Sequence, residues 1–392
     1  MQISIAILPL TSRLACAAFI SDRALPSSVP AISPSERHGN IAHGHVARGN
    51  VASNCRDVTF TVSATAQNQV ATSPPPNLLN LDASLAFLAQ PVELTTVSGT
   101  QKIYGQYCEP VKDSSRAKTL QFLVHGITYD HKYWAGFQTI PSSALYSWVT
   151  GDPITLVQAP YQVELLHDII CQLRSSAHAA IPTSWTRIIY VGHSYGSILA
   201  TQLSSKHPKD IDGYILSGFA VPLPNEIQLR GVVGDDYSQA SPERLPQAVN
   251  APGYLISNNK KGRADSFYSR PEVDFSSVHY DLDFDTRGTM AMGEALTTVE
   301  IYNSTSYTSP VYVLTGQHDA MFCGNGSRTL GTPDCGSGAT SQLAAVKMFY
   351  PAVPASSFDY YAQPNSGHTL QQHYAAVKGF AKAHAFLAYH GF

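Results

Sequence analysis

The chain has 392 residues, of which 44% are hydrophobic and only 14% are charged, and its formal net charge is −3. This composition can bury a sizeable core, and it lacks the basic excess that nucleic acids and acidic membranes attract. No apolar run in the sequence is long enough to span a bilayer. We therefore expect one large domain with an insertion, or two smaller domains, with no nucleic-acid partner and no membrane span.

The N-terminal segment resembles an imperfect secretory signal. Residues 3–10 form a short apolar run, Arg13 interrupts it and residues 14–20 resume it, but no basic residue precedes the run. We predict a signal peptide over residues 1–21 and hence a secreted protein, with a misassigned start codon or a folded N-terminal segment as the alternatives. Residues 22–50 are rich in Ser, Pro, Gly and His without periodicity, which indicates a disordered leader.

The first ordered elements are two predicted strands. Polar and apolar residues alternate over 58–66 and again over 97–107, and a short helical pattern over 82–88 separates them. Cys55 and Cys108 flank these strands, so they could form a disulfide in an oxidising compartment.

A third strand is predicted over 119–127, where an apolar run ends in His125-Gly126. The backbone N–H of Ile127 follows this strand and is a candidate donor for an oxyanion hole. Five side chains near this loop and near the serine described next are candidates for a substrate pocket. They are His125, Thr128, Tyr129, Trp134 and His193.

The sequence around Ser194 carries the strongest chemical signal. Residues 187–191 form an apolar, β-branched run, Gly-His-Ser-Tyr-Gly follows at 192–196, and a helical pattern begins at once. A strand, a sharp turn and a helix lift the serine hydroxyl above the sheet, where it can act as a nucleophile. The N–H of Tyr195, next to that serine, is the second candidate oxyanion donor. A strand–turn–helix that carries serine by chance is the alternative reading.

A serine nucleophile needs a base, and the base needs an acid that orients it. In strand–serine–helix enzymes the acid and then the histidine follow the serine along the chain. Asp319 directly follows an apolar run over 310–316 that predicts a buried strand, and His368 lies in a turn before the last helix. We predict that His368 is the general base for Ser194 and that Asp319 orients it.

Other residues compete with these assignments or support them. Asp334 and Asp359 are rival acids, but neither directly follows a buried strand. Cys323 and Cys335 bracket a Gly-rich loop after Asp319, and a disulfide between them would hold that loop. Cys171 lies in an apolar helical stretch and is predicted to be a buried free thiol. Glycosylation sequons occur at Asn303 and Asn325.

Residues 221–308 fall between two core strands, hold many aromatic residues and show little periodicity before a helix predicted over 289–301. We predict that this segment is a cap that closes the site, inserted between core segments 51–220 and 309–392. Its basic run at 260–263 is predicted to be a solvated loop. A last helix over about 370–389 is expected to dock on the sheet through Val377, Phe380, Ala381, His384 and Leu387.

Together these features resemble the α/β-hydrolase superfamily over roughly residues 55–392. Cys-Arg-Asp-Val-Thr-Phe at 55–60 and the motif from His125 to Trp134 are also similar to secreted fungal members. The resemblance implies an α/β-hydrolase fold, which is a mostly parallel sheet flanked by helices with an inserted cap. It also implies a serine hydrolase that cleaves a carboxylic ester or lactone of a small organic substrate through an acyl-enzyme, without cofactor or metal. A peptidase or amidase, a lyase using the same triad and a catalytically silent binding protein are the alternatives.

One stretch departs from this family pattern. Before the helix that begins near Tyr161, the fold places a sheet strand beside strand 119–127, but residues 134–160 offer only the apolar runs 144–149 and 154–157. A missing inner strand would leave buried backbone donors and acceptors unpaired. We hypothesise that the chain carries an internal deletion between residues 134 and 152.

Overall fold

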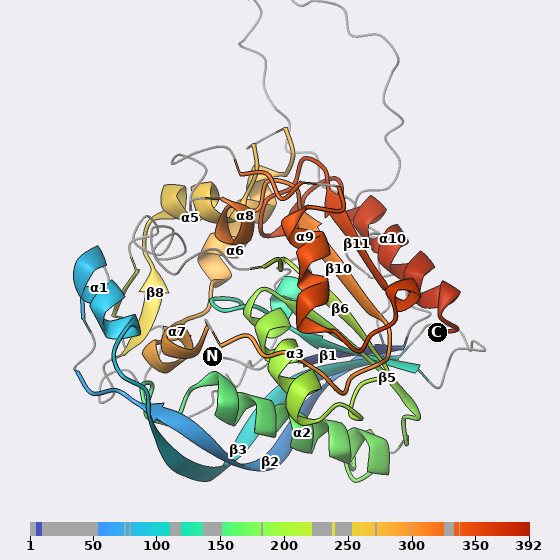
Figure 1. Ribbon diagram of the computed structural model, residues 1–392, viewed down its shortest axis with the longest axis horizontal. Coiled ribbons are helices and arrows are strands. Elements are labelled where there is room, and N and C mark those ends of the chain that lie inside the picture. The colour runs from blue at the N-terminus through green and yellow to red at the C-terminus, as the bar shows by residue number, and fades with distance from the viewer. Residues whose placement is uncertain are drawn as a thin grey trace, which may run out of the picture.

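The computed structural model describes residues 5–9, 54–73, 76–77, 80–109, 119–135, 151–181, 183–221, 237–239, 253–270, 273–298, 300–324, 333–336 and 338–392. The strands of its main sheet are β1 (Ile5–Pro9), β2 (Asn54–Val70), β3 (Glu93–Glu109), β4 (Thr119–Val124), β5 (Arg187–His193), β6 (Gly213–Ser217), β10 (Val311–Gly316) and β11 (Phe358–Gln363). Within the described residues these eight strands form one sheet with the order β11-β10-β6-β5-β4-β1-β3-β2 (Figure 1).

One half of this sheet, from β4 to β11, is parallel throughout. Both of its faces are buried, and successive side chains of β5 alternate between them. Ile188 and Tyr190 pack with helices α2 (Ala159–Ser175) and α3 (Tyr195–Lys206). Ile189 and Val191 pack with helix α10 (Ala376–Tyr389) on the opposite face. This helix–sheet–helix arrangement confirms the predicted α/β class.

The other half of the sheet contains a strand from the N-terminal segment. β1 pairs antiparallel with β4 on one side and parallel with β3 on the other. This is the inner position beside β4 that the sequence had left without a strand. Part of the predicted signal peptide, 1–21, is therefore placed in the sheet, where it pairs backbone groups that β3 and β4 would otherwise leave unpaired. Removal of residues 1–21 from the folded protein is incompatible with this arrangement.

The hypothesis of an internal deletion concerns the loop after β4. Residues 136–150, including the apolar run 144–149, lie outside the described residues. The run 154–157 belongs to a turn in which Ile154 N and Thr155 N donate to Asp152 Oδ1 at 2.9 and 2.7 Å. That run therefore does not supply the inner strand, and β1 takes the position instead.

Strands β2 and β3 form a long antiparallel ribbon at the end of the sheet. Their register runs from Asn54 opposite Glu109 to Val70 opposite Glu93. The disulfide between Cys55 and Cys108 links them near one end. Cys323 and Cys335 form the second predicted disulfide.

Cys171 is a free thiol, as predicted, but it is exposed rather than buried. It lies one position after the buried Ile170 on α2, where the helix turns its side chains toward solvent.

Segment 221–308, predicted to be a cap and called the cap below, contains short elements in its described parts. These are β7 (Tyr237–Gln239), β8 (Tyr254–Ser257), α5 (Lys260–Phe267), α6 (Ser277–Thr286), β9 (Met290–Ala291) and α7 (Met292–Thr297). Among them β7, β8 and β9 form an antiparallel sheet. The helix predicted over 289–301 is thus shorter than expected. The basic run 260–263 is the start of α5 instead of a solvated loop, and Arg263 at its end is fully buried.

The remaining short elements are α1 (Leu81–Leu88), η2 (His131–Ala135), α8 (Ala320–Cys323), α9 (Gln342–Ala345), η5 (Val346–Phe349), η6 (Ala355–Ser357) and η7 (Leu370–Gln372). The last predicted helix is divided into η7 and α10. Its buried face is shifted from the prediction, because Val377 and Ala381 are exposed. The residues buried on α10 are Ala376, Gly379, Phe380, Ala383, Phe386 and Leu387.

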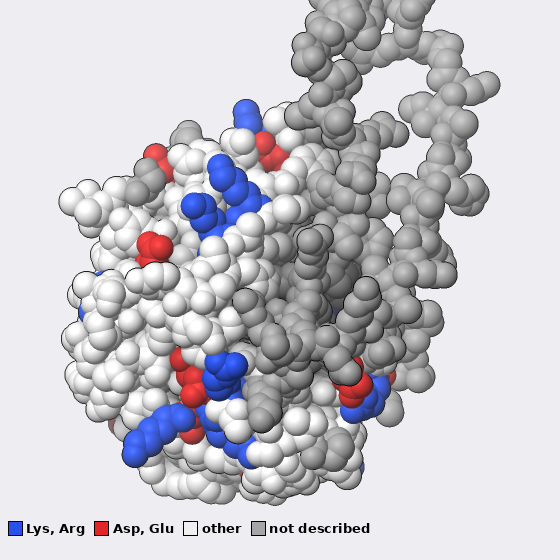
Figure 2. Space-filling view, turned by 90° about the vertical axis from the view of Figure 1, so that its right-hand side faces the viewer, with Lys and Arg blue, Asp and Glu red and all other residues white. Residues whose placement is uncertain are grey.

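The surface carries few charges, as the composition requires. Figure 2 shows basic and acidic side chains in small groups among uncharged residues on one face of the molecule. In the part of the chain that the structure describes, no helix has both the length and the apolarity that a membrane crossing needs.

Candidate active site

Ser194 lies in the sharp turn between β5 and α3. Its φ of 54° and ψ of −117° are unusual for a residue with a side chain. The turn is tight because a Cβ on Gly192 would lie 2.7 Å from the backbone of Gly196, and one on Gly196 would lie 2.3 Å from the carbonyl oxygen of Val124. Ser194 N also donates to Ser217 O at 2.8 Å. The glycine spacing that marks this motif therefore has a direct steric cause.

Three predicted side chains meet above this turn. His368 Nε2 lies 2.8 Å from Ser194 Oγ, and His368 Nδ1 lies 2.8 Å from Asp319 Oδ2. The other carboxylate oxygen, Asp319 Oδ1, accepts hydrogen bonds from the N–H groups of Met321 and Phe322 at 2.9 and 3.0 Å. Because Asp319 caps α8 in this way, its carboxylate is held with one oxygen facing the imidazole.

The rival acids have other contacts. Asp334 Oδ1 accepts a hydrogen bond from Gly336 N, and Asp359 is an exposed residue of β11 whose Oδ1 accepts from Tyr360 N. The structure thus brings Asp319, rather than either rival, to His368.

The sheet explains why these residues converge. Ser194, Asp319 and His368 follow β5, β10 and β11, and the carboxyl ends of parallel strands lie along one edge of a sheet. The acid and base loops also touch, since a Cβ on Gly316 would lie 2.1 Å from Gly367 O. A strained serine turn after an inner parallel strand, followed in sequence by an acid and a histidine, is the arrangement of one known fold.

The chain has the α/β-hydrolase fold. Comparisons with known proteins add only distant likenesses. No family model matches the sequence, and no curated protein matches it significantly.

Solved structures similar to this chain include a methylesterase from Arabidopsis, with 13% identity, 68% of this chain and 98% of that chain covered, and a TM-score of 0.40. A thermophilic esterase from Thermogutta terrifontis has 14% identity, with coverage of 68% and 86% and a TM-score of 0.37. An α/β-hydrolase enzyme from a Medee basin deep-sea metagenome library has 14% identity, with coverage of 71% and 92% and a TM-score of 0.41. The fold itself is evident from the strand order and the serine turn.

The loop after β4 lies directly against the serine. A Cβ on Gly126 would lie 2.8 Å from Ser194 Cβ, so the backbone of the next residue, Ile127, passes beside the nucleophile. Tyr195 is the first residue of α3, on the other side of Ser194. The two predicted oxyanion donors are thus on segments that adjoin the serine hydroxyl.

His125 and His193 pack beneath the site. Both are fully buried, and His125 Nδ1 lies 2.8 Å from Gly126 O. The ring of His193 stacks on Tyr133 at 4.4 Å and lies 5.0 Å from the ring of His368. Burial, together with the neighbouring His368 and His125, holds the pKa of His193 well below its usual value. His193 is therefore neutral at physiological pH and packs against His368.

Two other predicted pocket residues, Thr128 and Tyr129, are buried in contacts with neighbouring segments. Tyr129 Oη lies 2.5 Å from the Oγ1 of Thr369, the residue after the base. Thr128 Oγ1 accepts a hydrogen bond from Arg263 of the cap at 3.1 Å. These contacts tie Tyr129 to the segment after His368 and Thr128 to α5, and their role in a substrate pocket stays a prediction.

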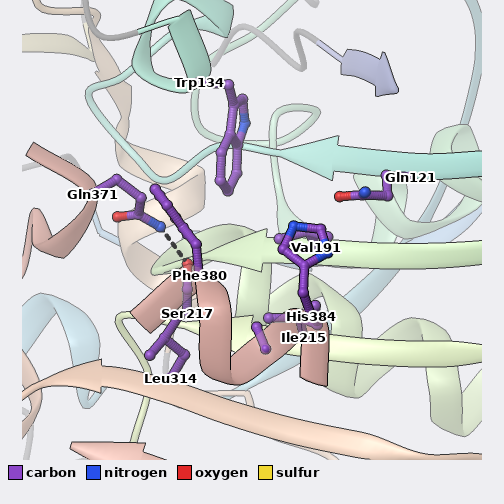
Figure 3. A pocket seen from close by; sticks show the side chains of 10 residues that line it. Gln121, Trp134, Val191, Ile215, Ser217, Leu314, Gln371, Phe380 and His384 are labelled. Atoms are coloured by element: carbon purple, nitrogen blue, oxygen red, sulfur yellow. Dashed lines mark hydrogen bonds between the residues drawn. The ribbon is translucent and has the colours of Figure 1, made fainter. Parts of the chain in front are cut away.

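Trp134 lines a separate cavity of about 20 Å³ between the sheet and α10 (Figure 3). Gln371 and Ser217 also border it, and Gln371 Nε2 donates to Ser217 Oγ at 2.8 Å. Ser217 Oγ in turn donates to Gly192 O behind the serine turn. A space of this size holds about one water molecule, so it is too small for an organic substrate. Trp134 is thus placed at this cavity, not at the serine.

Two buried polar networks that no sequence pattern predicts join the cap to the site. Arg263 pairs with Asp283, and both side chains are fully buried. In the second network Tyr195 Oη donates to Gln162 Oε1, and Gln162 Nε2 donates to Glu294, each at 2.7 Å. Burial raises the pKa of Glu294. No local pattern marks these residues, because their partners are distant in sequence.

One cluster of potential metal ligands lies outside the site. His167, His207 and Asp210 offer ligand atoms within 4.8 Å of one another. However, the two imidazoles stack at 3.7 Å with only 8° between their planes, so their nitrogen lone pairs do not point toward a common centre. His167 Nδ1 lies 2.6 Å from Asp210, and His207 Nε2 lies 3.1 Å from Glu164. We assign this cluster to hydrogen bonding between α2 and the end of α3.

Proposed function

We propose that this protein is a serine hydrolase that cleaves a carboxylic ester or lactone of a small organic substrate. The observation that carries the proposal is the position of His368, whose two ring nitrogens lie 2.8 Å from Ser194 Oγ and 2.8 Å from the Asp319 carboxylate. A hydroxyl with a base on one side and an acid behind that base can be deprotonated as it attacks a carbonyl carbon.

In the proposed reaction Ser194 Oγ attacks the ester carbonyl while His368 takes its proton. The N–H groups of Ile127 and Tyr195 stabilise the negative oxygen of the tetrahedral intermediate. His368 then returns the proton to the leaving alcohol, which leaves an acyl group on Ser194. Water, deprotonated by the same imidazole, releases the acid and restores the serine.

Labelling with a fluorophosphonate tests this proposal. Such a probe reacts with an activated serine, so we expect an adduct that peptide mapping assigns to Ser194. The Ser194→Ala variant should not react, whereas the control Ser205→Ala, on the same helix but outside the site, should react as the unaltered protein does. Esters, lactones and amides of increasing size would then define the substrate, and incorporation of isotopically labelled water oxygen would separate hydrolysis from a lyase reaction.

A catalytically silent binding protein is the second candidate. One observation favours it, because Ser194 is only 8% exposed and His368 only 2% exposed. If the folded protein does not react with fluorophosphonates of any size, the binding function becomes the better interpretation.

We also propose that the protein matures in an oxidising compartment, as a secreted protein would. Two disulfides and an exposed sequon at Asn303 support this location. The second sequon, at Asn325, lies outside the described residues. Intact mass and N-terminal sequencing of the mature protein will establish whether the disulfides and sugars are present and whether β1 is retained.

A further inference from the structure

Thr128 is the residue of the oxyanion loop with the most unusual backbone. Its φ is +65°, a left-handed conformation that β-branched residues rarely adopt. It directly follows Ile127, whose N–H is a proposed oxyanion donor. The Ile127 N–H belongs to the peptide unit between Gly126 and Ile127, directly before Thr128, so anchoring Thr128 fixes the end of the short segment that presents that donor. What holds Thr128 in this conformation therefore bears on catalysis.

Two groups of the cap hold Thr128 in this conformation. Arg263 Nη1 donates to Thr128 Oγ1 at 3.1 Å, and Gly288 N donates to Thr128 O at 2.8 Å. Hydrogen bonds from the cap thus hold both the side chain and the backbone of Thr128.

The guanidinium of Arg263 is itself fixed from several directions. Its Nε and Nη2 donate to the two carboxylate oxygens of Asp283 at 3.2 and 2.7 Å, and Tyr268 Oη donates to the same carboxylate at 2.7 Å. The rings of Tyr129 and Phe267 lie 4.9 and 4.7 Å from its central carbon. A planar group held by a carboxylate and two aromatic rings has its remaining nitrogen, Nη1, fixed in one direction.

Helix α5, which carries Arg263, also contacts His368. Phe267, one turn after Arg263 on α5, has its ring 5.3 Å from the ring of His368. Its carbonyl oxygen accepts a hydrogen bond from Thr369 N at 2.8 Å. Helix α5 therefore contacts the loop of the oxyanion donor through Arg263, near its middle, and the loop of the base through Phe267, its last residue.

Stability alone does not account for the buried ion pair. Replacing such pairs by apolar residues of similar volume is often neutral or stabilising, because two desolvated charges gain little net energy from one another. What an apolar pair could not supply is the third hydrogen bond, from Arg263 to Thr128.

We propose that Arg263, oriented by Asp283, is a positioning residue that sets the oxyanion loop through Thr128, so that docking of α5 completes the site. This inference rests on the proposed serine hydrolase function. It predicts that the hydrogen bond matters for the transition state, where the oxyanion forms, and not for binding of the uncharged substrate.

The decisive variant is Thr128→Val, which removes the hydroxyl but keeps the shape and leaves the Arg263–Asp283 pair intact. We expect kcat to fall about 10- to 100-fold with little change in KM, since a small displacement of a catalytic group has effects of about this size. The affinity for a trifluoromethyl ketone, which forms a tetrahedral adduct, should fall by the same factor. Thr128→Ser, which keeps the hydroxyl, should restore both values.

Arg263→Lys provides a second measurement, because it keeps the charge but cannot bond Asp283 and Thr128 with the same geometry. We expect a similar fall in kcat, and urea unfolding of both variants will show whether the fold is intact. A folded Thr128→Val protein with unchanged kcat and unchanged ketone affinity would overturn the positioning role. Absence of fluorophosphonate labelling in the unaltered protein would instead overturn the proposed function, so the two failures are distinguishable.

Discussion

The two halves of the main sheet have different tasks. The parallel half, β4 to β11, places Ser194, Asp319 and His368 at one edge. The other half, β1, β3 and β2, contributes no member of this triad, and it covers the side of β4 that faces away from β5. The proposed chemistry thus depends on one half, whereas the integrity of the sheet depends on both. Changes in the first half should alter rates, and changes in the second should alter stability.

The largest effect on rate is expected for Asp319→Asn. The amide can still cap α8, so the fold should persist, but it favours the wrong imidazole tautomer. We expect kcat for an ester to fall by about 10⁴-fold with an unchanged unfolding midpoint. Asp334→Asn serves as the matched control with unchanged kcat. A fall of less than tenfold in Asp319→Asn would show that another group orients His368.

The largest effect on stability is expected when residues 1–21 are deleted. Each buried backbone group that loses its partner costs about 1–3 kcal/mol, so several such losses approach the total stability of a typical domain, about 5–15 kcal/mol. We expect the deleted chain to aggregate or to lack a cooperative urea transition. Replacing residues 22–50 by a Gly/Ser segment of equal length is the control and should leave the transition in place. A mature protein that lacks β1 and unfolds at the same midpoint would contradict the placement of β1 in the sheet.

The two disulfides offer a direct comparison between the halves. Removing Cys55–Cys108, which closes a loop of 53 residues, should lower the free energy of unfolding by about 2–4 kcal/mol with little change in kcat. Removing Cys323–Cys335 should also lower kcat, because this disulfide borders the helix that Asp319 caps. Serine variants, urea unfolding and ester kinetics measure both effects, with Cys171→Ser as the control. An equal fall in kcat after removal of either disulfide would contradict the expectation that changes in the first half alter rates and changes in the second alter stability.

The smallest effect concerns pH. His193 has a folded-state pKa well below its usual value of 6.5, so below about pH 6.5 the unfolded chain binds a proton that the folded chain does not. This residue therefore lowers the free energy of unfolding as the pH falls, by up to about 1.4 kcal/mol per pH unit. We expect His193→Phe, which cannot titrate, to show a shallower decline between pH 7 and pH 5. Parallel declines in the two proteins would mean that His193 binds its proton at the same pH in the folded and the unfolded chain.

The sequence was sufficient to predict the strands and site residues that a local pattern of residues marks. The buried strands β4, β5 and β10 are mainly apolar runs, and the glycines around Ser194 mark a turn that sterics impose. The order of serine, acid and histidine then selected Asp319 and His368, and the structure brings them together. β11 was missed because Phe358–Gln363 alternates little and is only partly buried.

The sequence was not sufficient where burial depends on distant partners. Arg263 looked like part of a solvated basic run, yet its partners are Asp283, 20 residues later, and Thr128, 135 residues earlier. The place of Ile5–Pro9 could not be read from its own composition either. It depends on an unfilled position between β3 and β4, which only the assembled sheet reveals.

The order of the triad along the chain has a consequence for synthesis. Ser194 and its base are 174 residues apart, and the base comes later. At a synthesis rate of about 5–20 residues per second, the serine is made about 9–35 s before its histidine. Throughout that interval the nascent chain carries an unactivated hydroxyl. In the proposed mechanism the serine of a nascent chain therefore stays unactivated until the segment around His368 has been made and has folded onto the sheet.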